Sequence, residues 1–158
     1  MRQDPRVPVQ PDFSALEDMA ARTVDEYRQD RVTRKEAREA EERERQEFLS
    51  AFRLAKTRVL TPALQRVASA ASSFREPLIA SPPGHDETLS LSLKPLANDE
   101  HNGDAAKLTI TADFHARQVI CIADPGAEGL AMWEISEITV EAVQVVAEKF
   151  LRKALGLS

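Results

Sequence analysis

The chain has 158 residues, of which 42% are hydrophobic, 30% are charged and 5% are aromatic, and its formal net charge is −5. This length suits one ordinary domain, or one small domain plus an extended element, and excludes a large multi-domain enzyme. A disulfide-stabilised scaffold is excluded because Cys121 is the only cysteine. We therefore expect a cytoplasmic protein, and the lack of a long apolar segment or of a signal-like N-terminus predicts no contact with a membrane.

Charge divides the chain into two unlike parts near the sequence Ser81-Pro82-Pro83-Gly84. Residues 1–80 contain 15 basic and 14 acidic side chains, net +1, whereas residues 81–158 contain 6 basic and 12 acidic ones, net −6. Neither part has the unbalanced excess of basic residues that is typical of nucleic-acid-binding proteins. We predict four segments, which are a flexible arm of residues 1–12, an extended helical region of residues 13–80, a linker of residues 81–87 and a small α+β domain of residues 88–158.

A long N-terminal helix is predicted from Ser14, because neither glycine nor proline occurs between this residue and Leu60. Ser14 and Glu17 have the spacing of a capping box at its start. An apolar stripe at helical spacing covers the first turns and consists of Leu16, Ala20, Val24 and Tyr27. An unbroken helix of this length cannot fold back on itself. We therefore expect a second chain to cover the stripe, with a coiled coil as one arrangement.

The segment that follows the stripe has almost no apolar residues. Between Arg28 and Glu47, 14 of 20 residues are charged, seven of each sign. Acid-before-base pairs four residues apart, such as Asp30 with Arg34, favour a solvated helix. An Arg-lined nucleic-acid surface is the alternative interpretation. Because acids alternate with bases along the segment, we expect that nucleic acid is not a partner.

Hydrophobic periodicity returns at Phe48, Phe52 and Val59 and continues beyond Pro62. We expect a kink or a break near Pro62 and a second helix from there to about Arg75. The apolar faces of these two helical segments predict burial against the C-terminal domain, against a second chain, or against both.

Beyond the helical region the hydrophobic period changes to two, which is typical of half-buried strands. Four strands are predicted, at Leu89–Leu93, Lys107–Phe114, Arg117–Ala123 and Leu130–Ile135. Their short, turn-rich connections favour an antiparallel meander. A final amphipathic helix with Thr139 as its N-cap is expected to pack on this sheet. The predicted fold class is therefore α+β, with one four-stranded sheet and one C-terminal helix packed on it.

Residues that could carry chemistry are few. The histidines His85, His101 and His115 have no second ligand at metal-binding spacing, and the loop Asn98–Gly103 lacks the closing glutamate of a calcium loop. Cys121 lies within a predicted strand, where a buried thiol is expected rather than a nucleophile. We therefore expect no catalytic residue, no metal and no cofactor.

These observations predict a non-enzymatic adaptor that self-associates as a dimer through its helices and presents the α+β domain to a protein partner. The candidate interaction residues are apolar: Leu16, Val24, Tyr27, Phe48, Phe52, Val59 and Trp133. The alternative is a small-molecule-binding or catalytic domain. Its pocket would lie between sheet and helix, or between two chains, around Trp133, His115 and Cys121.

Overall fold

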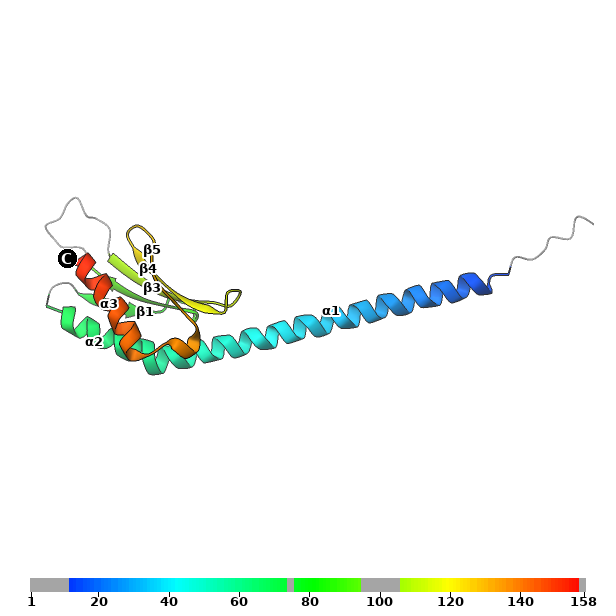
Figure 1. The fold of residues 1–158 in the computed structure, drawn as a ribbon, viewed down its shortest axis with the longest axis horizontal. Coiled ribbons are helices and arrows are strands. Elements are labelled where there is room, and N and C mark those ends of the chain that lie inside the picture. Colours follow the sequence, from blue (N-terminus) through cyan, green and yellow to red (C-terminus); the bar gives the residue numbers. More distant parts are fainter. Residues whose placement is uncertain (1–11, 74–75, 95–105, 157–158) are drawn as a thin grey trace, which may run out of the picture. The chain divides into compact units, whose positions relative to one another are not determined.

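The computed structural model describes residues 12–73, 76–94 and 106–156 of the chain (Figure 1). The chain divides into two compact units, Met1–Arg43 and Glu44–Ser158. The described residues of the first unit, 12–43, are called the helical unit below, and the described residues of the second unit are called the head. In these residues no helix is both long enough and apolar enough to cross a membrane.

Helix α1 spans Ser14–Ala55, as the lack of glycine and proline predicts. Its cap differs from the predicted capping box. The Asp12 carboxylate accepts a hydrogen bond from the Ser14 N–H at 3.0 Å, and the Glu17 N–H donates to the Phe13 carbonyl at 2.8 Å. Asp12 thus satisfies a free N–H of the first turn, and hydrogen bonds from the Ser14 hydroxyl and N–H lower the pKa of its carboxyl group.

A π-helical turn, η1 (Lys56–Leu60), connects α1 directly to helix α2 (Thr61–Ala71). It stands where the sequence predicted a kink or a break. Pro62 has no backbone N–H to donate to a helical carbonyl, and the preceding Thr61 N–H donates to the Lys56 carbonyl, five residues back. The helical path therefore continues through the proline. Helix α2 ends at Ala71, before the predicted end at Arg75, which lies outside the described residues.

Five strands form one antiparallel sheet with the meander order β1-β2-β3-β4-β5. The strands are β1 (Pro77–Ala80), β2 (Thr88–Leu93), β3 (Ala106–Asp113), β4 (Gln118–Asp124) and β5 (Glu128–Trp133). The meander and the last four strands confirm the prediction, but the predicted number of four strands is wrong. Strand β1 lies within the stretch that was assigned to the helical region. It has only four residues and begins with a proline, which an edge strand tolerates, so its sequence is too short to show a period although its burial alternates.

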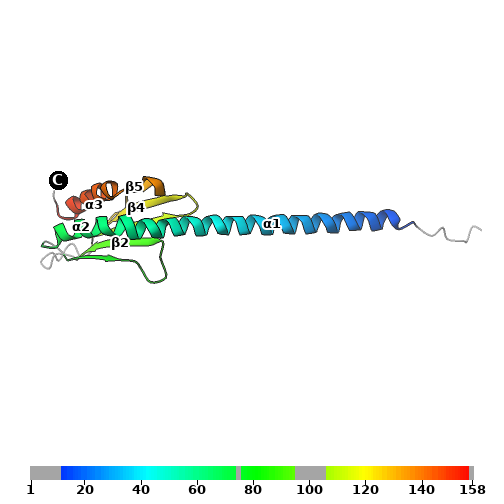
Figure 2. The same ribbon diagram turned by 90° about the horizontal axis from the view of Figure 1, so that it is seen from below.

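Helix α3 (Val140–Ala154) contacts α2, and the two lie side by side on one face of the sheet (Figure 2). The predicted N-cap is confirmed, since the Thr139 hydroxyl accepts a hydrogen bond from the Ala142 N–H at 3.2 Å. A short 3₁₀ turn, η2 (Ile135–Glu137), precedes it. The fold is therefore α+β, with helices on one face of a single sheet.

The core lies between this sheet face and the helices. The strand register places Leu91 opposite Leu108 and Ile110 opposite Cys121, and all four side chains are buried. The helices contribute further fully or nearly fully buried side chains, among them Phe52, Leu60, Leu64, Val143 and Phe150. The opposite sheet face carries mainly hydroxyl and aliphatic side chains, such as Thr109 paired with Ile122. The small domain thus gains its core from α1, η1 and α2 as well as from α3.

Candidate interaction surface

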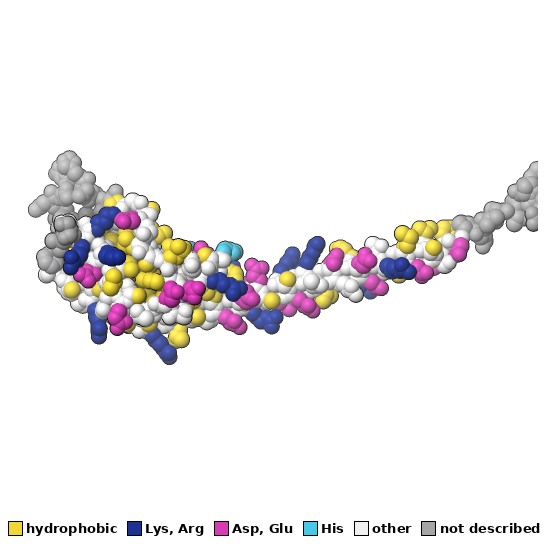
Figure 3. Space-filling view, in the orientation of Figure 1, with side chains coloured by type: hydrophobic (Ala, Val, Ile, Leu, Met, Phe, Trp, Pro, Cys, Tyr) yellow, Lys and Arg dark blue, Asp and Glu magenta, His cyan; other side chains and the backbone are white. Residues whose placement is uncertain are grey.

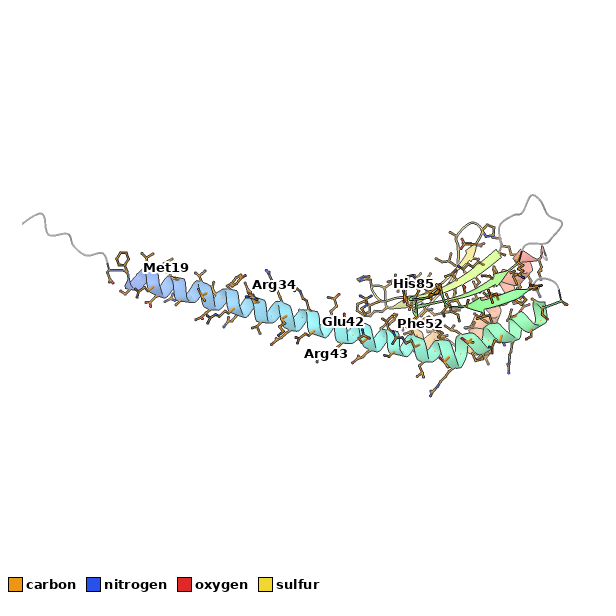
Figure 4. All side chains as sticks on the ribbon, turned by 180° about the vertical axis from the view of Figure 1, so that it is seen from behind. Met19, Arg34, Glu42, Arg43, Phe52 and His85 are labelled. Carbon is orange, nitrogen blue, oxygen red and sulfur yellow. The ribbon has the colours of Figure 1, made fainter. Side chains whose placement is uncertain are left out.

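The helical unit exposes its apolar side chains. Every residue from 12 to 39 is exposed. Five large side chains in the first turns are between 47% and 63% exposed, and they are Phe13, Leu16, Met19, Val24 and Tyr27. We call these five residues the apolar stripe. Figure 3 shows hydrophobic side chains gathered along one side of the first turns of α1, and Figure 4 labels Met19 among them.

The stripe occupies one face of the helix. An α-helix turns by about 100° per residue, so its five side chains fall within an arc of about 140°. Val32 is also exposed, by 55%, but its side chain lies about 150° from the middle of this arc. Single exposed apolar residues are common, whereas a contiguous apolar surface on one face is a candidate for an interaction site. The predicted residues Leu16, Val24 and Tyr27 belong to this surface.

Phe13 and Met19 complete the stripe although the sequence prediction did not include them. Phe13 precedes the first helical residue, and Met19 stands at the edge of the arc. Their spacing of three residues on either side of Leu16 is the signal that identifies them.

Local interactions in the helical unit are few. Lys35 and Glu39 form an exposed ion pair at 4.0 Å, and Arg43 donates from Nε to the Glu39 carbonyl at 3.4 Å. The predicted pair of Asp30 with Arg34 is not among the ion pairs of the described residues. A helix that lacks tertiary packing gains little stability from such pairs. A partner that covers the stripe would therefore stabilise this helix as well as bind it.

A second surface follows the stripe along the same side of α1. Five cationic side chains lie within about 60° on either side of Arg31, and they are Arg28, Arg31, Arg34, Lys35 and Arg38. We call these five residues the basic face. Together with Tyr27 and Val32 they line one shallow hollow on the helix. The Arg31 guanidinium lies 6.0 Å from the centre of the Tyr27 ring, within the range of a cation–π contact.

The predicted interaction residues in the second half of α1 and in η1 pack within the core of the head. Phe52 is fully buried and points from α1 toward the sheet (Figure 4). Phe48 is half-buried, and its ring meets that of Phe114 edge-on at 6.1 Å. Val59 packs partly buried against the same core. The structure therefore separates these residues from Leu16, Val24 and Tyr27, which are exposed.

Ion pairs and a hydrogen bond connect the loops of the sheet to α1 and η1. Arg117, in the turn between β3 and β4, pairs with Glu44, while Arg53 lies 3.6 Å from Asp86 in the connection between β1 and β2. Lys56 also donates to the Asp86 carbonyl at 3.4 Å. All these side chains are exposed or half-exposed, so they position loops and contribute modestly to stability.

The alternative function placed a pocket around Trp133, His115 and Cys121, but the structure does not bring these residues together as a polar site. Cys121 is fully buried, and burial raises the pKa of its thiol to about 12, which keeps it protonated and unreactive. Trp133 is half-buried opposite Val119 on the helix-covered face, whereas His115 is exposed in the turn after β3.

Polar groups in the head are satisfied. Among the described residues Ser90 is the buried polar side chain, and its hydroxyl donates to the Ala80 carbonyl at 3.2 Å. No buried side-chain nitrogen or oxygen of these residues lacks a partner, and no three of their His, Cys, Asp or Glu side chains form a metal-binding group. The predicted acidic loop Asn98–Gly103, with His101, lies outside the described part of the chain.

Comparison with known proteins adds no relative. A scan against protein-family models, a search of curated proteins and a search of solved structures each gave no match to this chain. The function is therefore inferred from the residues and geometry of the chain itself.

Proposed function

We propose that this chain is a non-enzymatic adaptor that forms a homodimer through the apolar stripe of α1 and presents its head to a protein partner. The observation that supports self-association is the exposure of Phe13, Leu16, Met19, Val24 and Tyr27 on one helix face. A second copy offers a stripe of the same kind, so burial of both stripes removes apolar surface from water on each chain. We include a cytoplasmic location in the proposal because the one cysteine is unpaired and buried.

The stripe covers about two heptads, which is short for a coiled coil. Beyond it, heptad positions are occupied by Arg31, Arg34 and Arg38, which a dry seam would not accept. The contact is therefore confined to residues 13–27, and we expect reversible association rather than an obligate dimer. Association free energies of about 5 to 8 kcal/mol correspond to dissociation constants of roughly 1 to 100 µM, so dimer formation should be measurable in this concentration range.

Substitutions on the stripe test this proposal without touching the core of the head. Leu16→Glu combined with Val24→Glu should abolish dimer formation in sedimentation velocity, because four carboxylates would face one another across the contact. The matched control is Val32→Glu, which changes an equally exposed apolar residue on a different face of the same helix. This control should dimerise like the unsubstituted chain.

Two results would contradict the proposal. One is association of the double variant at the same concentrations as the unsubstituted chain. The other is an equal weakening by Val32→Glu, since the effect would then come from added charge rather than from the stripe. Circular dichroism provides a second measurement, because helix content should fall together with dimer content in the double variant.

A further inference from the structure

The basic face collects five cationic side chains over residues 28–38, which is about 15 Å of helix at about 1.5 Å per residue. Two acids, Asp30 and Glu36, lie in the same stretch, so its local excess is three positive charges. Acids and bases alternate along the sequence, but within residues 28–39 the helix places the acids beside the basic face rather than on it, and the next acid on that side is Glu42, one turn beyond Arg38. Asp30, Glu36 and the following Glu39 all lie about 80° or more from Arg31 around the helix axis.

The alternation of acids and bases along the sequence argued against an anionic partner. Their positions around the helix remove this argument for residues 28–39. Figure 3 shows dark blue side chains projecting from the middle of α1 on the side that carries the apolar stripe. Charges within a Debye length of about 8 Å at physiological salt dominate the potential that a ligand meets. An anion on this face therefore meets the cations first, although the whole chain has a net charge of −5.

The cations of the basic face have few partners among the described residues. Lys35 pairs with Glu39 at 4.0 Å, and both side chains are largely exposed. Arg31 lies over Tyr27. In the described part of the chain, Arg28, Arg34 and Arg38 have no ion pair. Three guanidinium groups are therefore available to an external anion at little cost.

We propose that the basic face binds the phosphate backbone of a nucleic acid. Four of its five cations are arginines, whose planar guanidinium groups bind phosphate oxygens in a bidentate manner. Phosphates recur about every 3.4 Å along each strand, so a 15 Å face spans roughly four of them. Contacts of this kind hold the backbone and do not read sequence.

This inference goes beyond self-association and does not depend on it. The stripe and the basic face use different residues and can be substituted separately. The test uses the full chain and fluorescence anisotropy with a labelled duplex DNA and a labelled single-stranded RNA of about 20 nucleotides, at about 50 and about 200 mM salt. The test variant combines Arg31→Gln, Arg34→Gln and Arg38→Gln.

The control variant combines Arg22→Gln, Arg43→Gln and Arg66→Gln. It removes the same charge from exposed positions outside the basic face, and Arg22 lies on the opposite side of the helix from Arg31. The unsubstituted chain should bind at low salt and lose affinity as salt rises, by about 0.9 logarithmic units per phosphate contact for each tenfold change in salt. The test variant should lower this slope by about 2 to 3 and weaken binding at least about tenfold, whereas the control should change it by less than about threefold.

Binding of either form of nucleic acid supports the proposal. Absence of binding at the lower salt concentration would overturn it, as would an equal loss of affinity in the control variant. Binding of polyglutamate with the same affinity and the same sensitivity to the test variant would also overturn it, because the face would then select acidic polypeptides. Sedimentation of the test variant distinguishes this outcome from failure of the proposed dimer, which should form in the variant as before.

Discussion

The head and the helical unit both carry apolar residues at helical spacing, but only the head buries them. Within the head, Phe52 of α1 and Leu64 of α2 are fully buried against the sheet. In the helical unit, Leu16 and Tyr27 of the same helix α1 are 60% and 63% exposed. The same sequence pattern thus has two outcomes, depending on whether a sheet is available to cover it. Where it is not, the uncovered stripe is the best indication of a partner.

The largest expected difference between the two units concerns stability. Phe52→Ala removes a fully buried ring and should lower the free energy of unfolding of the head by about 3 to 5 kcal/mol. Leu16→Ala, in the same helix but exposed, should change it by about 0.5 kcal/mol or less. Urea unfolding followed by Trp133 fluorescence measures both. Equal effects of the two substitutions would show that the stripe is part of the folded core after all.

A smaller effect should appear at high pH and only in the head. The pKa of the Cys121 thiol rises from 9.0 to about 12 on burial, so the folded state keeps a proton that the unfolded state releases above pH 9.0. The protonated thiol therefore stabilises the folded head fully below pH 9.0. This contribution to the free energy of unfolding is lost as pH rises toward 12, by about 1.4 kcal/mol per pH unit. Urea unfolding at about pH 8 and about pH 10 should therefore show a steeper decline for the unsubstituted chain than for Cys121→Ala. Parallel declines would mean that the thiol is accessible to water.

The cap of α3 should have an effect of similar or smaller size. Thr139→Ala removes the hydroxyl that accepts the Ala142 N–H and should cost about 1 kcal/mol of head stability. Thr139→Ser retains the hydroxyl acceptor, so it should reduce the stability of the head much less than Thr139→Ala does. If the two substitutions are equally harmful, the hydrogen bond is not the source of the stabilisation.

The smallest effect is expected from the ion pair between Glu44 and Arg117, where the head begins. Both side chains are more than half exposed, so a double-mutant cycle with Glu44→Gln and Arg117→Gln should give a coupling of about 0.2 to 1 kcal/mol. The coupling should shrink at high salt. A larger, salt-independent coupling would indicate that this contact is desolvated and contributes strongly to the stability of the head.

Much of the fold follows from the sequence, and the exceptions have physical causes. Alternation predicts β2 and β3 because each of these strands buries one face, apolar content and short connections predict β4 and β5, and Thr139 marks the start of α3. Strand β1 was not predicted, because four residues beginning with Pro77 are too few to show a period in the sequence. The π-helical turn before Pro62 is not visible in the sequence, because a helix can accommodate a proline either by ending or by shifting its hydrogen bonds.

The candidate surface was only partly predictable. The apolar spacing of Phe48 and Phe52 indicates burial but cannot distinguish the sheet of the same chain from a second chain. The structure resolves this ambiguity by placing both residues against the head. Likewise, the alternation of acids and bases in the sequence hides the grouping of five cations between Arg28 and Arg38, which becomes clear only when each residue is assigned a position around the helix.

Sedimentation velocity of the unsubstituted chain over roughly 1 to 100 µM examines self-association without any substitution. The mass of one chain is 17.6 kDa. The proposal predicts that the weight-average mass rises with concentration from this value toward twice it, and that the Leu16→Glu, Val24→Glu variant stays at the mass of one chain throughout. A chain that remains monomeric over the whole range would contradict the assignment of the apolar stripe as a dimer contact.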